Sequence, residues 1–199
     1  MGSPVKTLCV RFALDLQLDI IEDAADASTH KYWSGWMQKT NSMRILDAHG
    51  VPYRVHEFSP DVHSAEDAAA IMGVPSAQVF KTLVVKRQRG CPLLVMVCGD
   101  QALDLKALAR AIDEKKLNMA THKEAEAVTG LQVGAISALC LLNKGFLILA
   151  DEAIEACSEA HISAGVRGLN ISLAPADLLR VTKARLVRVA RAPEFDGER

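Results

Sequence analysis

Gln78–Lys86 has the sequence QVFKTLVVK, an apolar run rich in β-branched residues with a lysine near its middle. Such a run predicts a strand that is buried over most of its length. A second apolar run follows at Leu93–Cys98, and Gly90 and Pro92 lie between the two. Because glycine and proline mark turns, the two runs are expected to form a β-hairpin.

Helices and strands follow one another irregularly on both sides of this hairpin. Capping side chains, helix-ending glycines and a first-turn proline predict helices at residues 42–49 (capped by Asn41 or Ser42), 64–72, 104–112, 121–130, 151–157 and from Pro175. Strands are expected at residues 53–58 and 146–150, around Ile162 and Ile171, and at 186–190. Because strands and helices do not alternate steadily, we expect an α+β domain with a mixed sheet rather than a Rossmann fold.

The composition is that of an ordinary globular domain. Of the 199 residues 50% are hydrophobic and 24% charged, and the formal net charge is −1. No stretch approaches the roughly 18 apolar residues that a membrane span needs, so we expect no membrane partner. The five cysteines have no metal-ligand spacing. We therefore expect reduced thiols, a cytoplasmic protein and neither a metal nor a cofactor.

Three parts are expected along the chain. Residues 41–191 form one domain, residues 1–40 are a poorly ordered extension, and residues 192–199 are a tail. The first forty residues contain both tryptophans and an acidic stretch but no strand alternation. Met37 stands just before the first regular helix signal, and we take it as a candidate for the true start of the protein.

Two segments carry groups suited to catalysis. Lys81 lies inside the apolar run and either points to solvent or directs its ammonium at a phosphate or a developing oxyanion. Thr82 is expected on the opposite face of that strand unless the strand bends. Residues 129–137 combine Gly134 with small side chains, so backbone N–H groups there can approach a carbonyl oxygen. A helix end followed by a turn explains the same residues equally well.

A third segment, residues 163–170, places Arg167 between Gly165 and Gly168. Two glycines three residues apart predict a tight turn, and the arginine gives that turn a positive charge. A plain hairpin explains the glycines equally well, so this segment alone does not identify a site.

Together, the order and spacing of these segments resemble the YbaK/EbsC-like family of aminoacyl-tRNA deacylases, whose domain is also inserted in bacterial prolyl-tRNA synthetases as an editing module. The matching segments are Met43–Leu46, Gln78–Leu83, Asp104–Lys106, Thr129–Ser137 and Arg167–Leu169. The resemblance covers residues 41–191. It implies a mixed, partly barrel-like sheet flanked by helices. It also implies hydrolysis of the ester that joins a wrong amino acid to tRNA, typically Cys or Ala on tRNA(Pro).

The resemblance also implies roles for single residues. Lys81 is expected to position the terminal nucleotide and the aminoacyl group, and backbone groups of Gly134 and Ala135 to contact the substrate carbonyl. Substrate-binding residues are expected at Phe58, Thr82, Ser137, Ser163, Gly165, Arg167, Gly168 and Asn170. An aminoacyl ester is already activated, so orientation and oxyanion stabilisation matter more than a strong nucleophile. The attacking group is then water, or a thiol of the substrate, helped by the neighbouring ribose hydroxyl.

The chain departs from the family pattern in two segments, and in the turn at residues 163–170 the departures include Ala164 for the usual Gly and Val166 for a frequent Lys. Gly134–Ala138 has the sequence GAISA where the family usually has Gly-Gly-x-Ser-Pro, and Asn170 stands where it usually has Asp. The methyl group of Ala135 narrows the pocket, and Asn170 removes a negative charge. These departures support a second hypothesis, a non-catalytic module that binds aminoacyl-tRNA. A third is a partner subunit of prolyl-tRNA synthetase.

A basic stretch near the end of the chain is a candidate tRNA surface. Between Leu178 and Pro193 there are five basic residues and no acidic one. We assign tRNA binding, and no DNA binding, to Arg180, Lys183, Arg185 and Arg188. A solvated terminal strand accounts for these charges equally well.

Overall fold

The expected hairpin forms as β2 (Val79–Arg87) and β3 (Leu93–Cys98), which pair antiparallel with Lys81 opposite Val97. All six residues of β3 are buried. Both faces of this hairpin are therefore covered, which explains why its sequence is apolar on both sides instead of alternating.

The structure is a computed structural model that describes residues 38–62 and 64–193. Residues 1–37, which make up most of the expected extension and include Met37, lie outside the described residues, and so do residues 194–199 of the expected tail. In the described part of the chain no helix is both long enough and apolar enough to cross a membrane.

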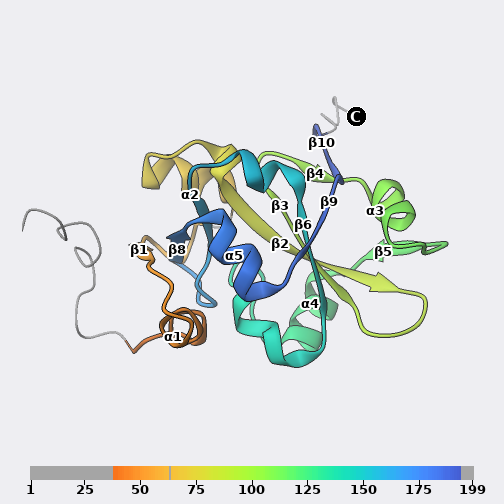
Figure 1. Cartoon of the computed structure of the whole chain (residues 1–199), viewed down its shortest axis with the longest axis horizontal. Coiled ribbons are helices and arrows are strands. Elements are labelled where there is room, and N and C mark those ends of the chain that lie inside the picture. The colour runs from red at the N-terminus through yellow and green to blue at the C-terminus, as the bar shows by residue number, and fades with distance from the viewer. Residues whose placement is uncertain (1–37, 63, 194–199) are drawn as a thin grey trace, which may run out of the picture.

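A mixed sheet extends from both edges of the hairpin (Figure 1). Seven of its eight strands run in the order β1-β8-β7-β2-β3-β6-β9, and the eighth, β5, pairs with β2. The pairs β7–β2, β3–β6 and β6–β9 are parallel and the others antiparallel. The remaining strands are β1 (Arg54–Glu57), β5 (Leu117–Met119), β6 (Leu147–Asp151), β7 (Ala160–Ser163), β8 (Leu169–Leu173) and β9 (Arg185–Val187). The expected mixed sheet flanked by helices is confirmed.

Local signals in the sequence place most helices. Ser64, Asp104 and Thr121 cap helices with their side chains, and Gly73 and Gly130 end two of them in the left-handed conformation. The helices are α1 (Asn41–Ala48), α2 (Ala65–Met72), α3 (Leu105–Ala111), α4 (His122–Thr129) and α5 (Pro175–Thr182), with 3-10 turns η1 (Ser76–Gln78), η2 (Leu139–Lys144) and η3 (Glu152–Ala156). The cap expected at Asn41 or Ser42 was wrong. Thr40 caps α1, because its side chain accepts a hydrogen bond from Met43 N.

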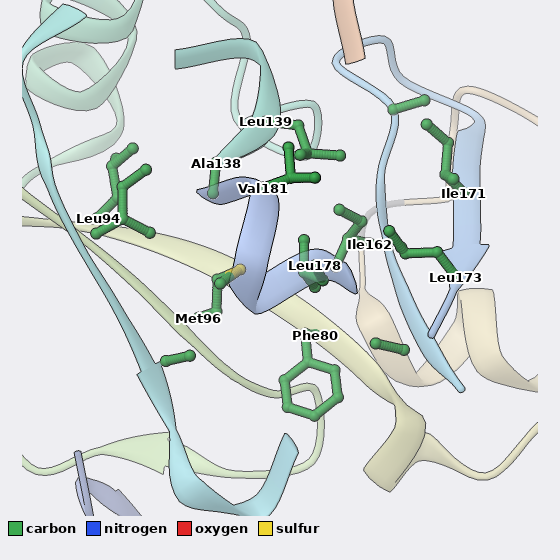
Figure 2. Packing of buried hydrophobic residues seen from close by; sticks show 14 of the residues in the cluster. Phe80, Leu94, Met96, Ala138, Leu139, Ile162, Ile171, Leu173, Leu178 and Val181 are labelled. Carbon is green, nitrogen blue, oxygen red and sulfur yellow. The ribbon is translucent and has the colours of Figure 1, made fainter. Parts of the chain in front are cut away.

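Two hydrophobic cores lie on the two faces of the sheet. Figure 2 shows part of the larger one, in which Leu178 and Val181 of α5 belong to the same buried cluster as Phe80 and Met96 of the hairpin. On the other face Leu93, Val95 and Val97 meet Leu108 of α3. Side chains that alternate along β3 contribute to both cores. Close packing on both faces therefore holds the hairpin, and any site built on it, rigidly in place.

The last strand is shorter than the sequence indicates. A strand was expected over residues 186–190, but β9 ends at Val187, and β10 (Ala190–Arg191) pairs with β4 (Ala102–Leu103) in a separate sheet. The buried carboxylate of Asp151 accepts hydrogen bonds from Val189 N at 2.8 Å and Ala190 N at 2.7 Å. These bonds hold the chain after β9 to the side chain at the end of β6 instead of to its backbone, and no local pattern reveals this contact between residues nearly forty positions apart.

A buried histidine lies on the arm of the sheet formed by β1, β8 and β7. His161 is 1% exposed, and neither ring nitrogen has a hydrogen-bond partner among the described residues. Its Nε2 atom lies 3.6 Å from Glu159 Oε2, and its ring centroid lies 5.2 Å from that of His56. Burial lowers the pKa of His161 to about 4, although the Glu159 carboxylate acts in the opposite direction.

Acidification should therefore destabilise the fold through His161. In the unfolded chain His161 takes up a proton below about pH 6.5, whereas in the folded protein it does so only near pH 4. The free energy of unfolding therefore falls by up to about 3 kcal/mol as the pH is lowered from about 6.5 to about 4. Thermal unfolding between pH 7 and pH 4 measures this loss, and His161→Leu should flatten it. The exposed His122 serves as the control through His122→Gln, which should keep the wild-type slope. Equal slopes for wild type and His161→Leu would contradict the expectation.

Candidate active site

The candidate site lies where one edge of β2 has no complete partner. β7 pairs with β2 only at Val79 and Phe80, and β5 pairs with it only from Val85 onward. A cavity of about 340 Å³ opens beside this gap. It is lined by Phe58, Val62, Ser64, Ala65, Glu66, Ala68, Val79, Phe80, Lys81, Thr82, Leu83, Val133, Gly134, Ile136, Ser163, Gly168 and Asn170. Such a recess between diverging strands suits a small ligand.

Lys81 and Thr82 both line this cavity although they are neighbours on one strand. Neighbouring side chains of a strand point to opposite faces. Because the cavity lies at the edge of β2, it is open to side chains from both faces of the strand. Lys81 and Thr82 can therefore both line it without the bend in the strand that was considered from the sequence. Lys81 is half-buried, and its Nζ donates a hydrogen bond to Gly99 O at 2.7 Å. Since an ammonium has three donors, this bond leaves two for a ligand.

Seven of the eleven residues expected at the site line the cavity. They are Lys81, Gly134, Phe58, Thr82, Ser163, Gly168 and Asn170. They come from β2, β8, the segments that follow β1 and α4, and the end and following turn of β7. Residues far apart in the sequence thus meet around one recess, as the resemblance implies.

The other four expected residues, Ala135, Ser137, Gly165 and Arg167, do not line the cavity. Ala135 is 3% exposed, and its N–H donates to Gln132 O at 2.9 Å. Ser137 is fully buried, with its hydroxyl 3.3 Å from the hydroxyl of Ser42 on α1. Both residues therefore support the loop from within. Neither lines the cavity, so the expected substrate contacts of the Ala135 backbone and of Ser137 have no counterpart among its lining residues.

Gly165 and Arg167 also make internal contacts. A Cβ atom on Gly165 would clash with Cys140 Sγ, so a larger residue there would have to displace that side chain. Arg167 Nε donates to Val133 O at 2.8 Å and so ties the turn after β7 to the loop after α4. Both residues therefore shape the cavity from outside.

Sequence reasoning missed the wall that α2 contributes. Ser64, Ala65, Glu66 and Ala68 line the cavity, although the sequence showed only a capped helix there. Glu66 is the one carboxylate among the lining residues that the structure describes, and Lys81 is the one ammonium. The cavity therefore has one anionic and one cationic side chain among the described residues that line it. No local pattern in the sequence marks Glu66, because its place in the site depends on how α2 packs beside β2.

The basic stretch lies away from the cavity and is partly paired. Arg180 pairs with Asp177, Arg188 with Glu152, and Arg185 donates to Ala111 O. Lys183 is exposed at the C-cap of α5. None of the four expected tRNA-binding residues lines the cavity. In the described part of the chain no three His, Cys, Asp or Glu side chains are grouped so that they could hold a metal ion.

Comparison with known proteins adds independent information on this arrangement. The family model described as "Aminoacyl-tRNA editing domain" matches residues 59–181, more than half of the chain. A protein of Enterococcus faecalis named "Putative Cys-tRNA(Pro)/Cys-tRNA(Cys) deacylase EbsC" is 39% identical over 154 residues, which cover 76% of this chain and 93% of that protein.

Two further comparisons concern prolyl-tRNA synthesis. The proline–tRNA ligase of Thermodesulfovibrio yellowstonii is 33% identical over 79 residues, which are 40% of this chain but only 14% of the ligase. A crystal structure described as a "putative trans-editing enzyme for prolyl tRNA synthetase" superposes with a TM-score of 0.68 at 24% identity. It covers 78% of this chain and all of that one. At this level of identity the superposition establishes a shared fold.

Proposed function

The chain belongs to the aminoacyl-tRNA editing domain family, and from this premise we propose that it hydrolyses the ester of tRNA(Pro) mischarged with cysteine. The observation that carries the proposal is the recess at the open edge of β2, where Lys81, Gly134 and Glu66 line one cavity. In the reaction water adds to the ester carbonyl and the bond to the ribose oxygen breaks. The products are the free amino acid and tRNA with its terminal hydroxyl restored.

The coverage of the relatives supports action in trans, outside a synthetase. The chain spans 93% of EbsC, whose name describes a deacylase, and 14% of the Thermodesulfovibrio yellowstonii ligase. The similarity to the ligase concerns a segment of that enzyme. An association with prolyl-tRNA synthetase, in which the synthetase hands over the charged tRNA, is compatible with this activity.

Lys81 supplies the positive charge that the reaction needs. A tetrahedral intermediate places a full negative charge on the former carbonyl oxygen, and prearranged donors stabilise that charge in a recess from which water is partly excluded. The bond from Lys81 Nζ to Gly99 O fixes the ammonium on one side and leaves two donors for the ester or the terminal phosphate. The Gly134 N–H is a second donor, because it has no hydrogen-bond partner among the described residues.

Among the described residues that line the cavity there is no histidine or cysteine, and the two serines contact backbone N–H groups. Ser64 Oγ accepts from Asp67 N, and Ser163 Oγ accepts from Gly165 N. Neither hydroxyl is paired with a base in the way a nucleophilic serine requires. This arrangement favours attack by water or by a group of the substrate itself, with the protein orienting the ester.

Glu66 is suited to bind the α-ammonium group of the amino acid, because its carboxylate lines the cavity from an exposed position on α2 where an opposite charge can approach it. Glu66→Gln should therefore raise KM about 3-fold to 5-fold and change kcat less than about 2-fold, since the contact of an exposed carboxylate is weak and is made equally in the ground and transition states. Steady-state deacylation measures both constants. Asp67→Asn is the matched control, because Asp67 is next on the same helix and does not line the cavity. Equal KM values for wild type and Glu66→Gln would remove Glu66 from the binding site.

The walls of the cavity favour a small uncharged side chain. Apart from Lys81 and Glu66, its side chains are apolar or carry hydroxyl and amide groups. Cysteine fits this description and appears in the name of EbsC. Discrimination between amino acids is then a matter of shape and of unpaired polar groups.

The basic stretch is proposed to bind the body of the tRNA. The double charge reversal Arg185→Glu with Arg188→Glu should weaken binding about 10-fold at 0.1 M salt and lower the salt slope by about two. A salt series of binding constants measures this change. Reversal of Lys39 and Arg54 alters the net charge equally and serves as the control. An unchanged slope in the Arg185/Arg188 variant would show that these arginines are only solvated surface.

A further inference from the structure

The loop beside the cavity contains a turn whose central peptide has two possible orientations. Gln132–Ala135 forms a β-turn, closed by a hydrogen bond from Ala135 N to Gln132 O at 2.9 Å. Gly134 occupies its third position with φ of +90°. A positive φ at that position defines a type II turn, and a type I turn differs from it mainly by a flip of the central peptide. In this loop the central peptide is the one that joins Val133 to Gly134.

Two charged side chains from different elements hold this peptide and the one before it. Arg167 Nε, from the turn after β7, donates to Val133 O at 2.8 Å. Glu126 Oε1, on α4, accepts from Val133 N at 3.0 Å. The arginine also packs along the turn, because a Cβ atom placed on Gly134 would lie 3.7 Å from Arg167 Nε. Hydrogen bonds to charged groups are roughly twice as strong as neutral ones, so these contacts strongly favour one orientation.

The orientation of the Val133 carbonyl decides where the Gly134 N–H points. In a trans peptide the C=O and N–H bonds point in opposite directions. Val133 O is directed at Arg167, which does not line the cavity, whereas Val133 and Gly134 themselves do. The Gly134 N–H therefore points away from Arg167. It has no hydrogen-bond partner among the described residues, and the neighbouring Ala135 N–H is already used by the turn.

We propose that Arg167 is a positioning residue that holds the Val133–Gly134 peptide with its N–H directed at the ester carbonyl of the substrate. The proposal rests on the proposed function, in which a backbone N–H of this loop stabilises the oxyanion. With the peptide flipped, the Val133 carbonyl would face the substrate and repel the developing negative charge. Arg167 thus acts on the reaction through Gly134 without touching the substrate.

The kinetic test separates this role from simple support of the loop. Loss of one oxyanion donor costs about 100-fold to 1,000-fold in kcat, and loss of the residue that orients the donor should cost somewhat less. Arg167→Ala should therefore lower kcat about 10-fold to 100-fold with KM changed less than about 3-fold. Added guanidinium ion should restore part of the lost kcat. Arg54→Ala removes another arginine, one that is paired with Glu159 outside the cavity, and should leave kcat unchanged.

A second measurement reports the peptide orientation without using activity. In protein labelled with 15N-glycine, the Gly134 amide resonance is identified by its loss in Gly134→Ala. That resonance should shift or broaden in Arg167→Ala and stay in place in Arg54→Ala. A Gly134 resonance unchanged by Arg167→Ala, or a wild-type kcat in that variant, would overturn the proposal. If wild-type protein hydrolyses no charged tRNA, the proposed function fails, and the Gly134 resonance still decides whether Arg167 orients the peptide.

Discussion

Replacing Lys81 by alanine should lower kcat/KM for deacylation at least about 100-fold and leave the protein folded. Lys81 has the one ammonium group among the described residues that line the cavity, and in the proposed reaction this group faces the ester and the terminal phosphate. Its removal takes away both transition-state stabilisation and part of the binding. The structural loss is small, because the side chain is half-buried and makes one hydrogen bond, to Gly99 O. A bond from a half-exposed ammonium contributes about 1.5 kcal/mol, so Tm should fall by about 3–6 °C.

Lys86 offers a matched control on the same strand. Its ammonium pairs with Glu124 at 2.6 Å, and it does not line the cavity. Lys86→Ala should therefore keep wild-type activity within about 2-fold, because an exposed pair contributes little even to stability. Steady-state hydrolysis of charged tRNA and thermal unfolding of both variants provide the comparison. A folded Lys81→Ala protein with more than about a tenth of wild-type activity would place Lys81 outside the catalytic machinery.

Gly168→Ala should cause the largest loss of stability among the glycine variants in the turn after β7. Gly168 has φ of +75°, and a Cβ atom there would lie 2.5 Å from Phe58 O and 3.0 Å from Pro60 N. Displacing these backbone atoms is costly, because Phe58 N also donates a hydrogen bond to Gly168 O at 2.9 Å. The left-handed backbone and the forced displacement together should cost about 3 kcal/mol, which lowers Tm by about 6–12 °C.

The variant Gly145→Ala measures the cost of the left-handed backbone without the steric clash. Gly145 has a similar φ of +74°, but a Cβ atom there would meet nothing within 4 Å. Gly145→Ala should therefore cost only the backbone part, about 1 kcal/mol. Thermal unfolding of the two variants measures the difference. Similar Tm values would mean that the close approach of Gly168 to Phe58 does not constrain the turn. Activity should also fall in Gly168→Ala alone, because Phe58 and Gly168 both line the cavity.

The sequence predicted those parts of the fold that depend on neighbouring residues. The caps Ser64 and Thr121 and the hairpin of β2 and β3 were predicted because capping and tight turns involve residues a few positions apart. The parallel pairings β7–β2 and β3–β6 were not, since a parallel pair depends on segments brought together by the whole fold. The short strands β4 and β5 were also missed, because two or three residues carry no readable period.

In the candidate site, too, some residues were predicted from the sequence and others were found only in the structure. Lys81 and Gly134 were found from a motif, and both line the cavity. Glu66 was missed because only the packing of α2 beside β2 brings it there. Ser137 and Arg167 belong to the same motifs but act through contacts with Ser42 and Val133, which lie far away in the sequence. A motif therefore identified which segments meet, and only the structure distinguishes a residue that faces the ligand from one that supports it.

The most direct test of the deacylase assignment is hydrolysis of tRNA(Pro) charged separately with Cys, Ala, Ser and Pro, by wild-type protein and by Lys81→Ala. Loss of the labelled amino acid from each tRNA is followed over time. We expect wild-type protein to clear Cys-tRNA(Pro) and to spare Pro-tRNA(Pro), and Lys81→Ala to clear neither. If wild-type protein binds the charged tRNA but clears none of the four species, the chain is a binding module on an editing fold, and the deacylase assignment is contradicted.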